Sequence, residues 1–187
     1  MSGFKPYDPN AEGGGGVVND STGWAQYADT TSTVGSPQVV SEGNTDVLLN
    51  DGANTITSNI PAGVTSLYDG ATNKLTPDTV GDAYLVRVSF TAYTSSQSGF
   101  ATLSLDIGAP QGVILSRGFT FPKGAGLSNA ISLSTTTLIY SLDTFIVNGG
   151  ELKITSNEGD TTIYDVDYVI SRTHKGCLLY TSPSPRD

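Results

Sequence analysis

The chain carries few side chains that could perform acid–base or nucleophilic chemistry near neutral pH. Among its 187 residues there is one histidine, His174, and one cysteine, Cys177. A Ser–His–acid triad would require His174 to fold back onto a serine of the core, and a zinc site would need ligands that the sequence lacks. We interpret His174 as a solvent-facing residue of the basic segment 172–175. No catalytic residue is assigned.

Paired carboxylates are the remaining route to an enzyme. Asp165 and Asp167 alternate with apolar residues, which would place both acids on one face of a strand, roughly 6 to 7 Å apart. A pair of acids can hydrolyse a glycosidic bond. Acids on the wet face of a strand also solvate a sheet and oppose edge pairing, and we favour that interpretation.

Several loops combine acidic residues with glycine, as calcium sites do. They are Asp51-Gly52, Asp69-Gly70 and Asn157-Glu158-Gly159-Asp160. Calcium prefers oxygen ligands, but none of these loops has the spacing of an EF-hand. Ordinary turn chemistry explains the same residues. We therefore expect no cofactor, and calcium is the one candidate that stays open.

Other loop residues could bind a ligand at the surface. We select Tyr68, Asp69 and Lys123, in the loops 66–82 and 122–128, as candidate surface-binding residues for a host glycan. Aromatic rings such as Trp24, Tyr68 and Tyr93 could stack on a sugar, although Trp24 is expected to cover the edge of the core instead.

The stretch Gly81–Ile107 is the clearest structural signal in the chain. Apolar residues recur at every second position from Tyr84 to Ala92, and again from Ala101 to Ile107. This period of two is typical of strands with one buried face. The polar turn 94–99 between them predicts an antiparallel hairpin.

The rest of the chain continues this texture. Further strands are expected at 24–31, 38–40, 46–49, 55–57, 113–121, 128–140, 142–147 and 152–155, with turns between them at Gly, Pro, Asn and Asp. In the closing strand, Tyr164, Val166, Tyr168 and Ile170 are expected to share one face. No helix is expected. The pattern predicts an all-β fold, an antiparallel jelly-roll β-sandwich of roughly eight to ten strands.

Composition limits the possible partners. The chain is 37% hydrophobic, only 14% of its residues are charged, and its formal net charge is −9. An acidic chain with scattered Lys and Arg lacks the basic surface of a nucleic-acid binder. No apolar run is long enough to span a membrane. We therefore expect neither nucleic acid nor a membrane as a partner.

The two ends differ from the middle. Residues 1–21 contain Pro6, Pro9 and the run Gly13–Gly16, which predicts a flexible N-terminal leader. The leader is either a disordered tail or an attachment peg built from Phe4, Lys5, Pro6 and Tyr7. Residues 22–176 are expected to form the jelly-roll domain.

The last eleven residues are Cys177-Leu178-Leu179-Tyr180-Thr181-Ser182-Pro183-Ser184-Pro185-Arg186-Asp187. Every one of them matches the translation, in one frame, of the transposase end sequence and adjoining adapter used in tagmentation sequencing libraries. We therefore expect residues 177–187 to be non-native and to pack poorly against the domain. Cys177 would then not be native, and the native C-terminus would be absent from the sequence.

Five motifs carry a resemblance that covers residues 22–176. They are Gly23-Trp24-Ala25-Gln26-Tyr27, Ser66-Leu67-Tyr68-Asp69, Gly81-Asp82-Ala83-Tyr84-Leu85-Val86-Arg87-Val88-Ser89-Phe90, Asn148-Gly149-Gly150 and Tyr164-Asp165-Val166-Asp167-Tyr168. Together they resemble small virion structural proteins of tailed marine bacteriophages, which are trimeric jelly rolls akin to tumour-necrosis-factor-like and complement-type globular heads.

The resemblance implies a non-enzymatic homotrimer in the virion, made in the host bacterial cytoplasm. It would serve as a capsid decoration, head fibre or tail spike tip, attached to a capsid or tail protein through the leader. No catalytic residue belongs to the resemblance. Two other functions stay open, a receptor- or glycan-binding module of a tail fibre and a small glycan-cleaving enzyme.

Overall fold

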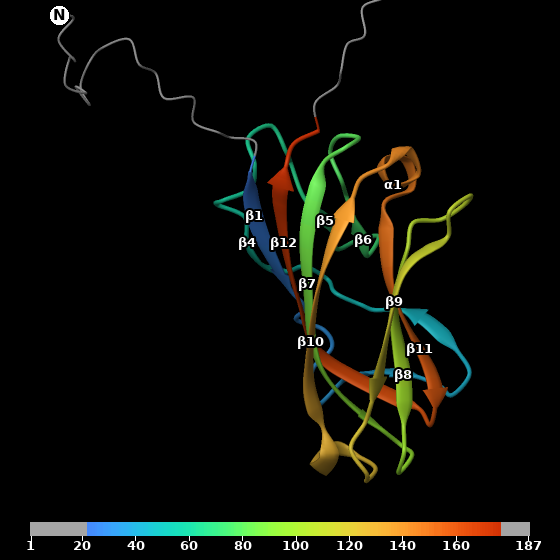
Figure 1. The fold of residues 1–187 in the computed structure, drawn as a ribbon. Helices are drawn as coiled ribbons and strands as arrows, with labels where there is room; N and C mark the ends of the chain where they lie inside the picture. Colours follow the sequence, from blue (N-terminus) through green and yellow to red (C-terminus); the bar gives the residue numbers. More distant parts are fainter. Residues whose placement is uncertain (1–21, 177–187) are drawn as a thin grey trace, which may run out of the picture.

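The computed structural model describes residues 22–176, which form a sandwich of two antiparallel sheets (Figure 1). The first sheet contains β1 (Gly23–Ala28), β2 (Gln38–Val40), β4 (Asn54–Ile56), β7 (Ala83–Thr94), β10 (Ile131–Tyr140) and β12 (Thr161–His174). The second contains β3 (Thr45–Val47), β5 (Tyr68–Asp69), β6 (Lys74–Leu75), β8 (Phe100–Asp106), β9 (Val113–Thr120) and β11 (Gly150–Glu158). The expected all-β sandwich is confirmed. The predicted leader and the final eleven residues lie outside the described residues.

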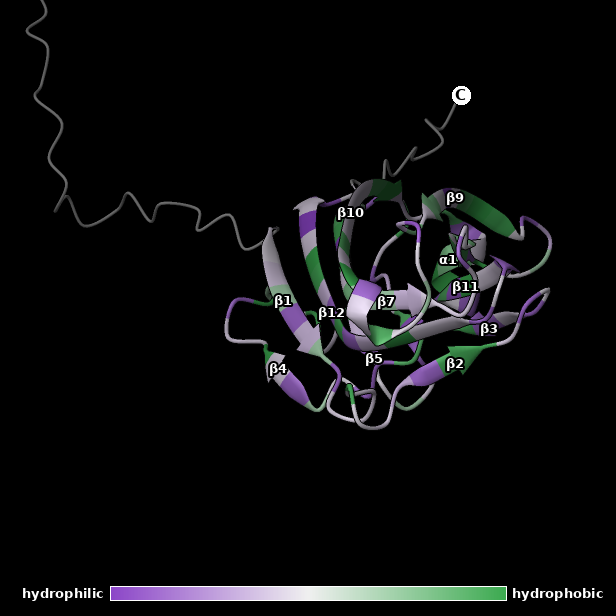
Figure 2. Cartoon of the chain, turned by 90° about the horizontal axis from the view of Figure 1, so that it is seen from below, coloured by the Kyte–Doolittle hydropathy of each residue, from purple (hydrophilic) through white to green (hydrophobic). Residues whose placement is uncertain are grey.

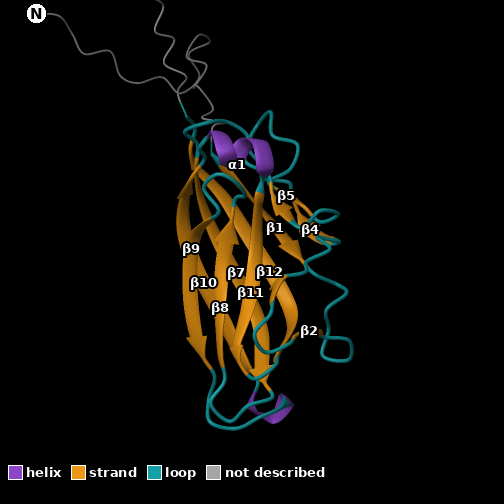
Figure 3. Ribbon diagram, turned by 90° about the vertical axis from the view of Figure 1, so that its right-hand side faces the viewer, coloured by secondary structure: helices purple, strands orange, loops and turns teal. Residues whose placement is uncertain are grey.

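Strand order follows from the pairing. The first sheet runs β10–β7–β12–β1–β4, with β2 also paired to β12, and the second runs β5–β6–β11–β8–β9, with β3 also paired to β11. Figure 3 shows both sheets running the length of the molecule, with a short helix at one end. No helix among the described residues is long and apolar enough to cross a membrane.

The expected hairpin of Gly81–Ile107 is wrong, although both of its strands exist. β7 pairs with β10 and β12, while β8 pairs with β9 and β11, so the two strands belong to different sheets. The polar segment 95–99 carries the chain from one sheet to the other. Alternation reports only that a strand has one buried face, and that condition is met equally by two strands facing each other across a core.

The closing strand β12 is central in its sheet and is not regular. Its pairing with β7 shifts between Tyr164 and Asp167, which marks a β-bulge. Tyr164 pairs with Thr91, whereas Tyr168 pairs with the buried Val88. Directly paired residues share a face, so the two tyrosines lie on opposite faces of the sheet. The expectation that Tyr164 and Tyr168 share a face is therefore wrong.

A short helix replaces one expected strand. Extended backbone is expected at 142–147, but α1 spans Asp143–Asn148, and a further 3-10 turn, η1, spans Leu127–Asn129. Helix α1 covers one end of the core with the buried Phe145 and stops at Gly149, where φ is 70°. Six residues are too few to show a helical period, and the β-branched and aromatic residues here favour a strand on propensity.

Tyrosine rings fill the middle of the sandwich. Tyr68 lies between Tyr27 and Tyr168, with ring centroids 5.4 Å and 5.1 Å apart, and the latter pair is edge-on. Each hydroxyl has a partner: Tyr27 donates to or accepts from Ser66, and Tyr168 donates to Leu48 O. Aromatic pairs of this geometry stabilise a core beyond their buried area.

A buried ion pair closes the same end of the sandwich as α1. The side chains of Arg172 and Asp82 are fully buried, with Arg172 Nη1 3.4 Å from Asp82 Oδ2 and 3.1 Å from Asp78 Oδ2. Tyr84 donates its hydroxyl to Asp82 Oδ2, and burial raises the pKa of that hydroxyl. This network fixes the start of β7 against the end of β12.

Candidate assembly surface

The two sheets end on the same side in strands that have no further neighbour among the described residues. β9 is the last strand of the second sheet and β10 the last strand of the first, and Figure 2 shows them on one side of the sandwich. We call this side the open seam, defined as β9 and β10. Such edges present free backbone N–H and C=O groups to any neighbouring chain.

The core is incompletely covered along the open seam. Four apolar residues there pack against the core yet stay only partly buried: Leu115, Phe119, Ile131 and Leu133. Phe119 still reaches across the sandwich, where its ring meets Phe90 edge-on at 5.9 Å between centroids. Half-exposed core residues along one side of a small domain are typical of a surface that another chain covers.

The open seam is also free of negative charge. No Asp or Glu occurs from Ile107 to Leu142, although the chain has 18 acidic residues, and the only charged residues there are Arg117 and Lys123. Copies of a chain with net charge −9 repel one another, so self-contact is most favourable where acids are absent. This gap in the acids is the one signal in the sequence that could have located the surface.

Exposed apolar residues extend from the open seam across the outer face of the first sheet. Leu138 of β10 is 52% exposed and pairs with the exposed Leu85 of β7. Leu85 pairs with Ser171, and Ser171 pairs with Trp24 of β1. The row ends at Trp24, which is 36% exposed and faces outward, so the expectation that it covers the core is wrong.

A polar groove lies beside this row on the same outer face. It has a volume of about 310 Å³, and its rim carries Ser89 and Thr91 of β7, Ser132 and Ser134 of β10, and Asp165. The hydroxyls pair across the strands, Ser89 with Ser134 at 3.1 Å and Thr91 with Ser132 at 3.4 Å.

Asp165 sits at the bulge of β12 with φ at 54°, in the left-handed region. Its backbone N–H donates to Ser32 O at 2.9 Å, while its exposed carboxylate has no hydrogen-bond or ion-pair partner among the described residues. Non-glycine residues held in this region are uncommon and gather at functional sites.

The two candidate catalytic acids differ in their surroundings. Asp167 Oδ1 accepts a hydrogen bond from Gln26 Nε2 at 2.7 Å, and its Oδ2 lies 3.6 Å from Arg87 Nη2. Asp165 has none of these partners, and the bulge removes the regular strand spacing that the paired-acid argument assumed. His174 is exposed, at the end of β12.

The candidate surface-binding residues are dispersed. Tyr68 is 3% exposed and lies in the core, so its ring cannot stack on a ligand. Asp69 lies in the turn between β5 and β6, where hydrogen bonds from Thr72 Oγ1 and Ala71 N–H lower the pKa of its carboxyl. Lys123 is exposed in the segment between β9 and η1. The peg Phe4–Tyr7 lies outside the described residues.

The acidic loops are occupied by their own hydrogen bonds. Asp51 accepts from Thr30 N–H and the Thr30 hydroxyl, and Asp160 accepts from Glu42 N–H. Within residues 22–176 no group of three or more His, Cys, Asp or Glu side chains could hold a metal ion. Turn chemistry accounts for these carboxylates where the structure describes them.

A charged cleft of about 120 Å³ opens beside α1, but its charges satisfy one another. Lys153 Nζ lies 2.8 Å from Asp106 Oδ2 and 3.1 Å from Glu151 Oε2, and Lys74 Nζ lies 3.5 Å from Glu151 Oε1. The hydrogen bond from Lys153 lowers the pKa of Asp106 and raises that of Lys153. No uncompensated charge remains in this cleft to attract a ligand.

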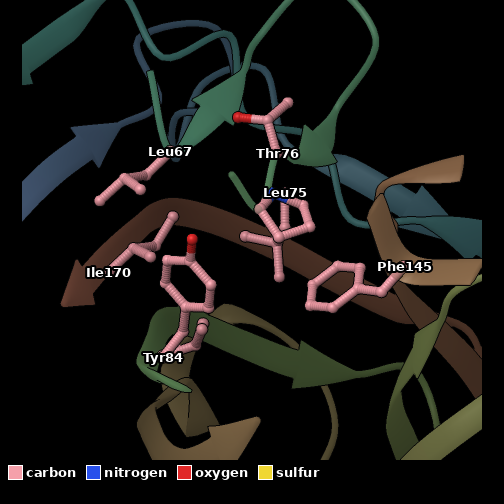
Figure 4. A pocket seen from close by; sticks show the side chains of 8 residues that line it. Leu67, Leu75, Thr76, Tyr84, Phe145 and Ile170 are labelled. Atoms are coloured by element: carbon pink, nitrogen blue, oxygen red, sulfur yellow. The ribbon is translucent and has the colours of Figure 1, made fainter. Parts of the chain in front are cut away.

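An apolar cavity under α1 is too small for a ligand. Figure 4 shows Tyr84, Phe145 and Ile170 directed into it, opposite Leu67 and Leu75. Its volume is about 10 Å³, close to the smallest space that holds one water molecule. It is a packing gap of the core.

Comparison with known proteins supports the fold alone. No family model matches the chain, and no curated protein matches it significantly. The structure of the tumour necrosis factor Eiger from S. frugiperda matches with a TM-score of 0.55 at 13% identity, over 84% of this chain and 96% of that one. The chain is thus a jelly-roll β-sandwich similar to that protein.

Two viral structures also match, with lower scores. The vertex protein P5 of PRD1 has a TM-score of 0.42 at 14% identity, over 80% of this chain and 96% of that one. Infectious bursal disease virus, Gx strain, has a TM-score of 0.43 at 12% identity, over 84% of this chain and 33% of that one.

Proposed function

We propose that this protein is a non-enzymatic structural component of a phage particle, a homotrimer whose jelly roll is displayed outward as a capsid decoration, head fibre or tail spike tip. The observation that supports self-assembly is the open seam. Its core residues Leu115, Phe119 and Leu133 are half covered in a single copy, and no acid lies on either strand. Covering them with another copy removes apolar surface from water.

The oligomeric state tests this directly. Light scattering of the full chain at about micromolar concentration should give the mass of three copies, a range in which stable interfaces of ordinary size persist. Leu138→Asp, in the open seam, should reduce the assembly to monomers. Val39→Asp is the matched control, because Val39 is 54% exposed against 52% for Leu138 but lies on β2, away from the open seam. A monodisperse monomer of the unaltered chain would contradict the proposal.

Attachment to the particle is assigned to the leader, through the peg Phe4–Tyr7. Deletion of residues 1–16 should leave the trimer intact and abolish incorporation into particles, measured by co-sedimentation with purified phage. A truncated chain that still sediments with particles would disprove the peg. Mass spectrometry of purified phage particles tests the virion location itself.

A glycan-binding tail-fibre module is the alternative, and the hydroxyl-lined groove beside Asp165 is the observation in its favour. Asp69 and Lys123 would be further contacts from the loops 66–82 and 122–128. A glycan array with and without calcium separates the functions, since a purely structural protein binds nothing in either condition. Activity on host polysaccharide that is lost in Asp165→Asn or Asp167→Asn would instead indicate an enzyme.

A further inference from the structure

Two surfaces of the chain are complementary and face different directions. The open seam lies at the edge of the sandwich, whereas the groove beside Asp165 lies on the outer face of the first sheet. Surfaces that differ in this way cannot contact each other within one copy. They meet only when the edge of one copy is placed over the face of the next.

Each surface carries one charge without a partner. Arg117 pairs across β9 with the fully buried Leu103, so it belongs to the inward row of its strand, yet its side chain is exposed at the open side of the sandwich. Among the described residues Arg117 has no hydrogen bond or ion pair, and neither has the carboxylate of Asp165. The opposite charges are thus available to each other in neighbouring copies.

We propose that the open seam of one copy docks in the groove of the next, with Arg117 of the first paired to Asp165 of the second. This inference rests on the proposed trimer and specifies its contact. The half-exposed Leu115, Phe119 and Leu133 become covered, and the hydroxyls of the groove rim face the free edge of the arriving strand. A contact between two different patches is heterologous, and it closes into a ring.

A symmetric contact of two open seams is less favourable for this chain. It would bring Arg117 of one copy toward Arg117 of the other and would leave Asp165 outside the interface. Like charges at an interface are repulsive, whereas complementary charges fix the partner and its orientation. The charge distribution therefore favours a ring over a two-fold dimer.

Charge exchange at the two positions tests the docking, with the full chain and sedimentation velocity as the readout. Arg117→Asp and Asp165→Lys should each weaken assembly by about tenfold or more, the size typical of a close interfacial charge pair. The double variant should recover most of the loss. Lys175→Asp changes the net charge as Arg117→Asp does, but at an exposed site beyond β12, and it should leave assembly unchanged.

Circular dichroism of each variant shows whether it folds, and Asp165→Asn provides a second loss of charge that tolerates the left-handed backbone. A trimer that none of these changes weakens, or a double variant no better than the singles, overturns the docking and leaves the proposed trimer standing. A stable two-fold dimer also overturns it. A monomeric unaltered chain removes the proposed function and the docking together.

Discussion

The hydroxyl of Tyr68 lies between two acceptors in the core. It is 2.7 Å from Asn50 O and 3.1 Å from Asn73 Oδ1, and burial raises its pKa. Tyr68→Phe should lower the free energy of unfolding by about 1 to 2 kcal/mol, because Asn50 O is left without this donor. Urea denaturation measures the change.

Tyr93→Phe is the matched control for Tyr68→Phe. The Tyr93 hydroxyl has no hydrogen-bond partner among the described residues, so its removal should change stability by less than about 0.5 kcal/mol. Equal losses in the two variants would show that the hydrogen bonds of Tyr68 contribute nothing measurable.

Asp29 makes the fold sensitive to acid. Burial raises the pKa of its carboxyl, but hydrogen bonds from Asp51 N–H, Ser32 and Thr31 outweigh it and lower the pKa to about 2. A carboxyl whose pKa is lower in the folded than in the unfolded chain stabilises above its unfolded pKa. Its contribution should therefore be lost as the pH falls from about 4 to about 2.

Thermal unfolding across this pH range measures the effect. Asp29→Asn should be less stable than the unaltered chain at pH 7, and the difference should shrink toward pH 2. Asp46→Asn removes an exposed carboxylate that accepts no hydrogen bond in the described chain, and it should leave the profile unchanged. A difference for Asp29→Asn that persists undiminished at pH 2 would contradict the assignment.

At the scale of single residues, the sequence was informative about type and not about partners. Alternation placed Val86, Val88 and Leu103 correctly in the core. It could not place Tyr68, because a tyrosine beside an Asp-Gly turn is equally consistent with a surface loop and with a core ring whose hydroxyl finds an acceptor. It also could not reveal the bulge at Asp165, since aspartate carries no strong preference that marks one.

Two glycines at the ends of elements separate backbone strain from crowding. Gly159, which joins β11 to β12, has φ at 70°, and a Cβ there would lie 2.5 Å from Ser96 Cβ. Gly43, between β2 and β3, has φ at 80°, and a Cβ there would have no atom within 4 Å. Gly43→Ala should cost about 1 kcal/mol from the left-handed backbone alone.

Gly159→Ala should cost at least about 1 kcal/mol more than Gly43→Ala, because the backbone near Ser96 must also move. Denaturant unfolding of both variants measures the difference. Equal destabilisation would mean that the 95–99 connection yields without resistance, and that it does not hold the two sheets in place.

At the scale of elements, strand positions were predicted better than strand partners. β2 was located at its observed residues, and β7, β8 and β12 within a few residues of theirs. Sheet membership could not be predicted, because the polar turn 94–99 is compatible with a hairpin and with a crossing between sheets. Helix α1 was predicted as a strand because Phe145, Ile146 and Val147 favour extended backbone and six residues show no period.

For the whole molecule, assembly should be visible as a concentration-dependent melting temperature. Because the folded trimer buries the open seam and the unfolded chain does not, mass action stabilises it as concentration rises. The midpoint should increase by several degrees between about 1 and about 100 µM. Leu138→Asp should melt at one temperature throughout, and an invariant midpoint for the unaltered chain would argue against assembly.

The overall architecture was predictable because composition, alternation and turn residues agreed throughout residues 22–176. The assembly surface was not, because the evidence for it is an absence: no acid from Ile107 to Leu142. Only the structure shows that this stretch supplies the outermost strand of both sheets.

The position of β12 has a consequence for synthesis. It is the last strand of the described chain, yet it lies between β7 and β1 and pairs Gly23 with Arg172. During translation, β1 and β7 therefore leave the ribosome long before the strand that joins them. The first sheet cannot close until β12 has emerged, so we expect slow folding typical of high contact order. Protection of the nascent chain by chaperones would matter most during that delay.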